Sequence, residues 1–217
     1  LPNWRNAQLE FNKAVGKEFG YSGEGFVWLQ RTVEHLTGKD LETLAQQRIF
    51  LPLGMERTSY IFKEQFGDDY AIPHNMEMTT QAKYKIQEAN AAHSIQTTAR
   101  DYATFLVAIL QEKLLPPEVI AQMLQPQVTV SSNSYGQVMW GLGFGLQESG
   151  GKRQFWHWGD NGPCKAFFTV NPEKGKGVVY FSNSSNGLSM TEDLVKLFTS
   201  DPQPAIHWND YLNYKNP

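Results

Sequence analysis

Residues 155–181 read FWHWGDNGPCKAFFTVNPEKGKGVVYF, and this stretch decides the fold class. It contains short runs rich in aromatic and β-branched residues, which are typical of β-strands. Two turn-like segments separate the runs, Asn161-Gly162-Pro163 and Asn171-Pro172-Glu173-Lys174-Gly175. Because connections this short cannot cross over between parallel strands, the sequence predicts an antiparallel meander.

The residues just upstream extend this meander. Residues 139–146 are glycine-rich and apolar, and Glu148-Ser149-Gly150-Gly151-Lys152 is a turn signal, so we expect about four strands in all. Gly141-Leu142-Gly143-Phe144-Gly145 is not a dinucleotide-binding fingerprint, because we expect it inside a strand with no helix directly after it. A helix from Thr191 to about Thr199 follows the strands.

The first part of the chain carries helix signals. Ser22 is a candidate N-cap and Gly38 a candidate stop for a helix with a stripe of apolar residues that we expect to face the core: Phe26, Leu29, Val33 and Leu36. Asp40 is a candidate N-cap for a second helix, which should end at Pro52 and Gly54.

Two more helices are predicted near the middle of the chain. Thr98 followed by Asp101 resembles a capping box with Asp in place of Glu. Pro116-Pro117-Glu118 opens a further short helix. Residues 56–90 show no clean period, so we expect a long irregular excursion there.

Strands grouped apart from helices favour an α+β fold, in which helices flank an antiparallel β-sheet meander. We expect one domain. Residues 1–135 would form its mainly helical part, residues 136–200 the sheet with a C-terminal helix, and residues 201–217 a tail.

Composition excludes several classes of protein. The chain has 217 residues, and its 19 basic and 22 acidic residues give a net charge of −3 with no block of either sign, which argues against nucleic-acid binding. No stretch approaches the ~20 apolar residues of a membrane span. The single cysteine, Cys164, excludes an internal disulfide and a cysteine-based zinc site.

The sequence begins with Leu1-Pro2-Asn3-Trp4-Arg5, which lacks the basic and apolar regions of a signal peptide. It reads like a loop from the middle of a protein. We therefore expect this chain to be a piece of a longer gene product.

Two segments stand out together, Tyr21-Ser22-Gly23-Glu24-Gly25-Phe26 and His157-Trp158-Gly159-Asp160-Asn161-Gly162. With other blocks in the same order, they make the chain resemble the C-terminal two thirds of the serine β-lactamase-like family, which includes class C β-lactamases, D-alanyl-D-alanine carboxypeptidases and esterases. The other blocks are Ile49-Phe50-Leu51-Pro52-Leu53-Gly54-Met55, residues 91–106, Trp140-Gly141-Leu142-Gly143-Phe144-Gly145 and Phe181-Ser182-Asn183. The resemblance implies a β-lactamase/transpeptidase-like fold, truncated at its N-terminus.

The resemblance also implies a chemistry, acyl transfer through a serine ester, carried by Ser-x-x-Lys, Tyr-x-Asn and Lys/His-x-Gly motifs. Tyr21 falls on the tyrosine of the second motif and would shuttle a proton, for which neighbouring cations would have to lower its pKa. His157 falls on the cation position of the third motif and would polarise Tyr21 or meet a substrate carboxylate. The reaction needs no metal and no organic cofactor.

The same resemblance suggests substrate-binding groups. Gly159 would let its strand approach the substrate closely, and the backbone N–H of Asp160 would be an oxyanion donor. His93 lies where the family often has a residue near the cleft. Gly23 replaces the Asn of the second motif and His157 the Lys typical of β-lactamases, so β-lactam turnover in particular is less expected.

The Ser-x-x-Lys motif is the largest departure from the family pattern. Its one match, Ser149-Gly150-Gly151-Lys152, reads as a hairpin turn and follows the second motif, whereas the family's motif opens a helix and precedes it. We therefore expect the nucleophile to lie upstream of Leu1 and this chain alone to be inactive. Its partners would be the missing N-terminal segment and a small-molecule or peptide acyl substrate.

Other interpretations remain open. Tyr21 and His157 taken singly are equally consistent with packing residues. The chain could be part of a hydrolase acting on a peptide, ester or β-lactam, a non-catalytic cell-wall or ligand-binding relative, or an assembly domain. The sequence upstream of Leu1 distinguishes them. The resemblance implies a periplasmic or otherwise extracytoplasmic location.

Overall fold

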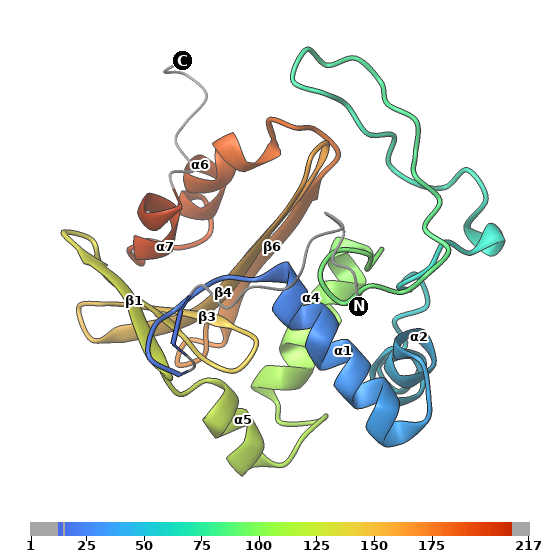
Figure 1. Cartoon of the computed structure of the whole chain (residues 1–217). Helices are drawn as coiled ribbons and strands as arrows, with labels where there is room; N and C mark the ends of the chain where they lie inside the picture. Colours follow the sequence, from blue (N-terminus) through green and yellow to red (C-terminus); the bar gives the residue numbers. More distant parts are fainter. Residues whose placement is uncertain (1–12, 15, 210–217) are drawn as a thin grey trace.

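The computed structural model, which describes residues 13, 14 and 16–209, is an α+β fold around one antiparallel sheet (Figure 1). The sheet has six strands in the order β1-β2-β3-β4-β5-β6, so every strand pairs with its neighbour in sequence. The predicted meander is therefore confirmed, with six strands where about four were expected. The strands are β1 Val128–Asn133, β2 Gly136–Trp140, β3 Gly145–Ser149, β4 Lys152–Asn161, β5 Cys164–Asn171 and β6 Lys176–Ser182.

Two glycine features set the geometry of the middle strands. Gly150 and Gly151 have φ values of 57° and 73°, which form the predicted turn between β3 and β4. Gly145 pairs with Trp156, and a Cβ at Gly145 would lie 2.7 Å from Cε2 of the Trp156 ring. Residues 141–144 connect β2 to β3, so the expectation that residues 141–145 lie inside a strand was wrong, because the chain turns there with Gly143 at φ 85°.

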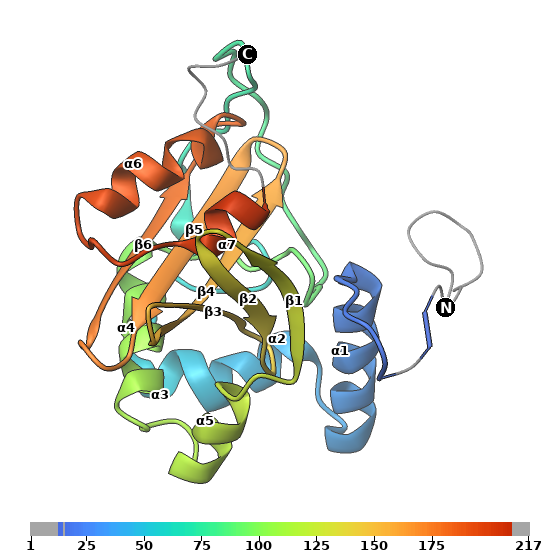
Figure 2. The same cartoon turned by 90° about the vertical axis from the view of Figure 1, so that its left-hand side faces the viewer.

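Helices cover both faces of the sheet (Figures 1 and 2). On one face, α4 (Ala99–Leu110) and α5 (Pro117–Met123) pack against a cluster that contains Phe144, Phe155 and Phe168. On the other face, α6 (Thr191–Lys196) and α7 (Pro204–Trp208) follow the short 3-10 helix η3 (Gly187–Met190) and pack on a cluster around Trp156. Residues 204–208, expected as part of a tail, thus form a helix whose residues Pro204, Ala205 and Ile206 are buried.

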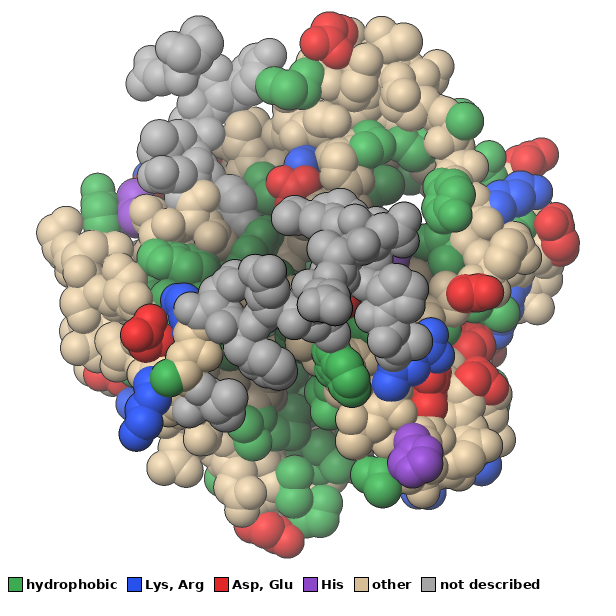
Figure 3. All heavy atoms as spheres, in the orientation of Figure 1, with side chains coloured by type: hydrophobic (Ala, Val, Ile, Leu, Met, Phe, Trp, Pro, Cys, Tyr) green, Lys and Arg blue, Asp and Glu red, His purple; other side chains and the backbone are tan. Residues whose placement is uncertain are grey.

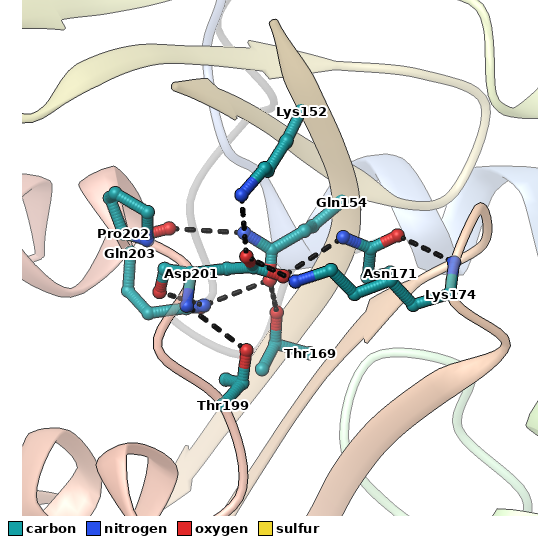
Figure 4. A network of polar contacts seen from close by, with 9 residues as sticks. All are labelled: Lys152, Gln154, Thr169, Asn171, Lys174, Thr199, Asp201, Pro202 and Gln203. Carbon is teal, nitrogen blue, oxygen red and sulfur yellow. Dashed lines mark hydrogen bonds and ion pairs between the residues drawn. The ribbon is translucent and has the colours of Figure 1, made fainter. Parts of the chain in front are cut away.

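A buried polar network fastens the segment before α7 to the sheet (Figure 4). The Asp201 carboxylate accepts hydrogen bonds from Asn171 Nδ2 at 2.9 Å and Lys174 Nζ at 2.6 Å, and Lys152 Nζ lies 3.5 Å away. The hydrogen bond from Lys174 and the other donors hold the pKa of Asp201 at about 2. Gln154 Nε2 donates a hydrogen bond to the Pro202 carbonyl at 3.0 Å, and Gln154 Oε1 accepts one from Gln203 Nε2 at 2.8 Å.

The first helix, α1 (Gly23–Thr37), has the predicted ends. Ser22 Oγ accepts from the Gly25 N–H at its start, and Gly38 ends it with φ 67°. Its apolar stripe, expected in the core, is instead exposed, with Leu29 at 59% and Leu36 at 77%. The reason is that α1 stands at the edge of the molecule, outside the helices that cover the sheet (Figure 2).

The second predicted helix is a continuous helical run made of α2 (Leu41–Ala45), a π-helical turn η1 (Gln46–Phe50) and α3 (Leu51–Leu53). Asp40 caps it as expected, accepting from the Thr43 N–H at 2.9 Å. Pro52 lies within its last turn rather than ending it, and Gly54 ends the run at φ 67°.

The capping box at α4 is half formed. Thr98 Oγ1 accepts from the Asp101 N–H at 3.1 Å, as predicted. The Asp101 carboxylate does not return to Thr98 but accepts from the Arg57 N–H at 2.9 Å and from Thr58 Oγ1 at 2.8 Å. These two hydrogen bonds anchor the start of the irregular segment of residues 56–90. The helix in that segment is the short η2 (Glu64–Phe66). None of the helices in the described part of the chain is long and apolar enough to cross a membrane.

Candidate functional site

Three segments of the chain meet at the end of β4. They are the residues that lead into α1, the loop around residues 89–94, and residues 157–161 of β4. The Tyr21 ring centroid lies 4.9 Å from that of Trp158 and 6.1 Å from that of His157. Asn161 Nδ2 donates to the His93 carbonyl at 3.2 Å, which joins the loop to the strand. The fold thus brings Tyr21 and His157, the two candidate catalytic residues, together.

One edge of β4 is open at this point. β3 pairs with β4 from Lys152 as far as Trp156, whereas β5 pairs with it as far as Asn161. Among the described residues, 157–161 therefore have no strand partner on the β3 side. Free backbone donors and acceptors along a strand edge can bind an extended ligand by strand addition.

Aromatic rings surround this open edge. Tyr21 contacts Trp140, at 5.9 Å between ring centroids, and Trp140 in turn contacts His157 at 5.5 Å. Tyr21 remains 46% exposed. Burial of the rest of its ring raises the pKa of Tyr21, whereas the sequence argument required cations that lower it. The Tyr21 hydroxyl is therefore protonated at neutral pH in this structure.

His157 is held against its own strand. Its Nδ1 lies 2.7 Å from the carbonyl oxygen of Trp158, and its ring stacks on the Trp158 ring at 5.2 Å between centroids. Burial lowers the pKa of His157, and the hydrogen bond to the Trp158 carbonyl opposes this only in part. The cationic role expected from the resemblance therefore has no support in this environment.

Asp160 and Gly159 lie on the open stretch of β4. The Asp160 carboxylate forms an ion pair with Lys165, whose side chain is only 9% exposed. The carboxylate is thus directed towards β5, and the backbone N–H remains the group expected to bind an oxyanion. A Cβ at Gly159 would lie 3.3 Å from the Cβ of Ala166, which is tight, so glycine suits this position.

The two remaining candidates lie beside the same edge. Gly23 is the first residue of α1, and a Cβ there would meet Ala92 at an ordinary 3.5 Å, so packing does not require glycine. His93 lies on an exposed turn in which its N–H donates to the Asn90 carbonyl at 3.2 Å. The His93 carbonyl oxygen accepts the hydrogen bond from Asn161 Nδ2, which joins this turn to β4.

Sequence reasoning missed Gln30, which fixes α1 to the loop. Its side chain is buried, its Nε2 donates to the Ala89 carbonyl at 3.0 Å, and its Oε1 accepts from the Ala91 N–H at 2.9 Å. A glutamine beside an apolar stripe gives no signal of this role, because its partners lie some 60 residues further along the chain.

A groove of about 330 Å³ opens beside Tyr21, and His157 is not among the residues that line it. It lies between the start of α1 and the strands β1 and β2. The residues that line it include Ser22, Phe26, Leu29, Val128 and Trp140. On the face in Figure 3, the described Lys and Arg side chains are scattered among Asp and Glu side chains rather than gathered in a patch. No group of three or more metal-ligating side chains occurs among the described residues.

The Ser149–Lys152 motif lies elsewhere. Ser149 pairs with Lys152 across the hairpin between β3 and β4, as the sequence predicted. Lys152 is directed to Asp201, 3.5 Å away, rather than to Ser149.

The chain is similar to penicillin-binding proteins and to a D-amino acid amidase. Penicillin-binding protein 4 of Amycolatopsis lactamdurans is 24% identical over 190 residues, which is 81% of this chain and 50% of that protein. The octameric penicillin-binding protein homologue from Pyrococcus abyssi superposes with a TM-score of 0.73 at 22% identity, covering 90% of this chain and 46% of the other. D-amino acid amidase from Ochrobactrum anthropi SV3, complexed with D-phenylalanine, gives a TM-score of 0.63 at 26% identity, covering 77% and 56%.

The chain therefore spans about half the length of the penicillin-binding protein that it matches. The β-lactamase/transpeptidase-like fold expected from the sequence is confirmed by the structural neighbours. The family model described as Beta-lactamase matches residues 5–198, which is most of the chain, and the protein thus belongs to the beta-lactamase family.

Proposed function

We propose that this chain is the substrate-binding part of a serine hydrolase that transfers an acyl group through a serine ester. The substrate would be a peptide, an ester or a β-lactam-like compound. The observation that carries the proposal is the meeting of Tyr21 and His157, 136 positions apart in the numbering, beside the open edge of β4.

In the proposed reaction the serine oxygen bonds to the acyl carbon, the bond to the leaving group breaks, and water then hydrolyses the ester. Tyr21 relays the serine proton to the leaving group through its hydroxyl. The Asp160 N–H stabilises the oxyanion, and Gly159 and Gly23 leave room for the substrate. His93 lies at the rim of the same edge and would contact the substrate.

We further propose that the nucleophile lies outside this chain, in a Ser-x-x-Lys helix of the polypeptide that precedes it. Lys152 is directed to Asp201, 3.5 Å away, and is therefore not placed to act as a base for Ser149. The exposed side chains of Trp28, Leu29 and Leu36 on α1 offer an apolar surface for that missing segment. The complete protein would act outside the cytoplasm, and this chain alone would be inactive.

A non-catalytic ligand-binding module is the second candidate, and one observation favours it. Burial raises the pKa of Tyr21, which makes its hydroxyl a weaker acid and a poorer source of phenolate. A cleft with this tyrosine and a partly buried histidine would bind an acyl compound without turning it over.

Intact-mass measurement with a penicillin-type or fluorophosphonate probe distinguishes the candidates. The chain of 217 residues should gain no mass. The protein from its native source should gain one probe mass, which peptide mapping places on a serine upstream of Leu1. A probe attached to Ser149 would contradict the proposal, and an unlabelled native protein would favour the binding module.

A further inference from the structure

A second cavity, of about 180 Å³, lies on the face of the sheet that α6 and α7 cover, beside the turn between β5 and β6. Residues of β4, β5 and β6 line it on one side. Residues 198–201, which follow α6, line it on the other. The cavity is therefore enclosed between the sheet and the segment that leads into α7.

The floor of this cavity is polar and buried. Its most buried side chains are each at most 4% exposed, and they are Gln154, Thr169, Asn171 and Asp201. Thr169 Oγ1 donates to Gln154 Oε1 at 3.2 Å, and Asn171 Nδ2 donates to the Asp201 carboxylate at 2.9 Å (Figure 4). Because these buried groups satisfy one another, the floor has a fixed shape. A ligand would therefore be held by the groups at the rim.

The rim is basic. Lys174 Nζ donates to Asp201 Oδ1 at 2.6 Å, and Lys152 Nζ lies 3.5 Å from the same oxygen (Figure 4). Lys176 is the register partner of Asn171, and side chains paired across two strands leave the sheet on the same face. The exposed Lys176 side chain therefore stands beside the cavity, which it helps to line.

Positive charge is in excess at this end of the sheet, because three ammonium groups meet one carboxylate. The hydrogen bond from Lys174 holds the pKa of Asp201 at about 2, so this carboxylate stays ionised at neutral pH. Glu173, in the turn between β5 and β6, is exposed and is not among the described residues that line the cavity. A dianion would balance the excess.

The rim also has hydrogen-bond donors that suit an oxyanion. An ammonium group has three N–H donors, and Lys174 uses one on Asp201, so it can hold a second acceptor at the same time. Thr199 Oγ1 accepts from the Asp201 N–H at 3.1 Å, which leaves the proton of the hydroxyl for another acceptor. Phe198 lines the same rim, is 62% exposed and offers an apolar wall.

We propose that this cavity binds a phosphate dianion, either inorganic phosphate or the phosphate group of a monoester. Lys174 and Lys176 would attract the phosphate oxygens by charge, and the Thr199 hydroxyl would donate to one of them. Near neutral pH a phosphate monoester carries a charge of about −1.5 to −2, which suits the excess at the rim. Binding here would not depend on acyl transfer, because none of the residues proposed for that reaction lines the cavity.

Isothermal titration calorimetry of the chain of 217 residues tests the site. At about pH 8, where phosphate is mainly a dianion, and at an ionic strength kept constant with chloride, one phosphate should bind per chain. Lys176→Gln, which leaves the Lys174–Asp201 pair in place, should weaken binding about tenfold.

The matched control is Lys113→Gln. Lys113 is an exposed lysine just after α4, on the opposite face of the sheet, and its loss changes the net charge by the same amount. We expect this variant to keep its affinity for phosphate to within about twofold. The absence of binding to the natural sequence would overturn the proposal. Equal weakening in the two variants would also overturn it, because diffuse attraction by the net charge would then explain the binding.

Phenyl phosphate distinguishes the two sources of the phosphate group. If the site serves a monoester, phenyl phosphate should bind several-fold more tightly than inorganic phosphate, and Phe198→Ala should abolish that difference. Tighter binding of inorganic phosphate would support the site as one for the free ion.

A second measurement covers the case in which Lys176→Gln does not fold. Acetic anhydride acetylates exposed lysines, and peptide mapping measures the rate at each position. Phosphate should slow the acetylation of Lys174 and Lys176 several-fold and leave that of Lys113 unchanged. Equal rates at Lys174 and Lys176 with and without phosphate would contradict the proposal.

Discussion

The two ends of β4 differ in how their polar groups are satisfied. At the start of the strand, Lys152 and Gln154 belong to a closed network in which Asp201 and Gln203 provide the partners (Figure 4). At the end, the backbone edge of residues 157–161 lacks a strand partner on the β3 side among the described residues. Where polar groups satisfy one another, the strand is fixed. Where they remain open, it can receive a ligand.

The closed end should give the largest effect on stability. Asp201→Asn leaves Lys174 and Asn171 without their carboxylate partner, and we expect the free energy of unfolding to fall by about 2 kcal/mol, because the Asp201 side chain is buried whereas that of Lys174 is partly exposed and can be hydrated. Urea unfolding measures it. Glu173→Gln, in the exposed turn beside Lys174, is the matched control and should change stability by less than about 0.5 kcal/mol. Equal losses in the two variants would show that the network does not stabilise the closed end.

The open end should give the largest effect on activity. In the complete protein, Tyr21→Phe should lower the rate of acyl transfer by about 10²-fold, because the hydroxyl that we propose as the proton relay is lost. Tyr135→Phe is the control, since Tyr135 is 48% exposed, much like Tyr21, but stacks on His207 away from the site. The rate of acylation by a chromogenic ester measures both. An unchanged rate in Tyr21→Phe would remove this residue from the mechanism.

Acid should weaken the closed end in a defined pH range. The pKa of Asp201 is about 2 in the folded chain and 3.8 in its ordinary state, so its contribution is present above about pH 4 and lost as the pH falls towards 2. We expect a loss of about 2 kcal/mol across that range. Urea unfolding at several pH values should show this loss in the natural sequence and not in Asp201→Asn. The same slope in both would contradict the assignment.

The smallest effect should be confined to α1. Gln30→Ala removes the hydrogen bonds to residues 89 and 91, and we expect the free energy of local unfolding of α1 to fall by about 1 kcal/mol. Hydrogen exchange should speed up in α1 and in the loop, while β4 and β5 keep their protection. Gln47→Ala, on an exposed part of the next helical run, is the control. Faster exchange throughout the sheet would mean that α1 supports the whole fold.

Local structure, such as helix caps and tight turns, could be predicted from the sequence. The caps at Ser22, Asp40 and Thr98 and the hairpin at residues 150–151 depend on residues close together in the chain, and all of them formed. β1 was missed because its residues alternate poorly between buried and exposed positions and end in Ser131-Ser132-Asn133, which resemble a turn.

The rest depends on tertiary contacts. The periodicity of α1 identified its apolar face but not whether another element would cover it. Tyr21 and His157 were linked by family resemblance, since no spacing rule joins residues so far apart. The directions in which the pKa values of Tyr21 and His157 shift followed only once their burial was known, because desolvation depends on tertiary packing.

Gly145 determines the length of the open edge. The Trp156 ring occupies the space that a side chain at Gly145 would fill, so no other residue of β3 fits opposite this tryptophan. The space left at Gly145 and the Trp156 ring that fills it therefore help to fix the register of β3 against β4. A slip of one residue would place Leu146 or Phe144 against the ring and move the point where pairing stops. The missing side chain at Gly145 thus sets the residue of β4 at which pairing with β3 stops and the open edge begins.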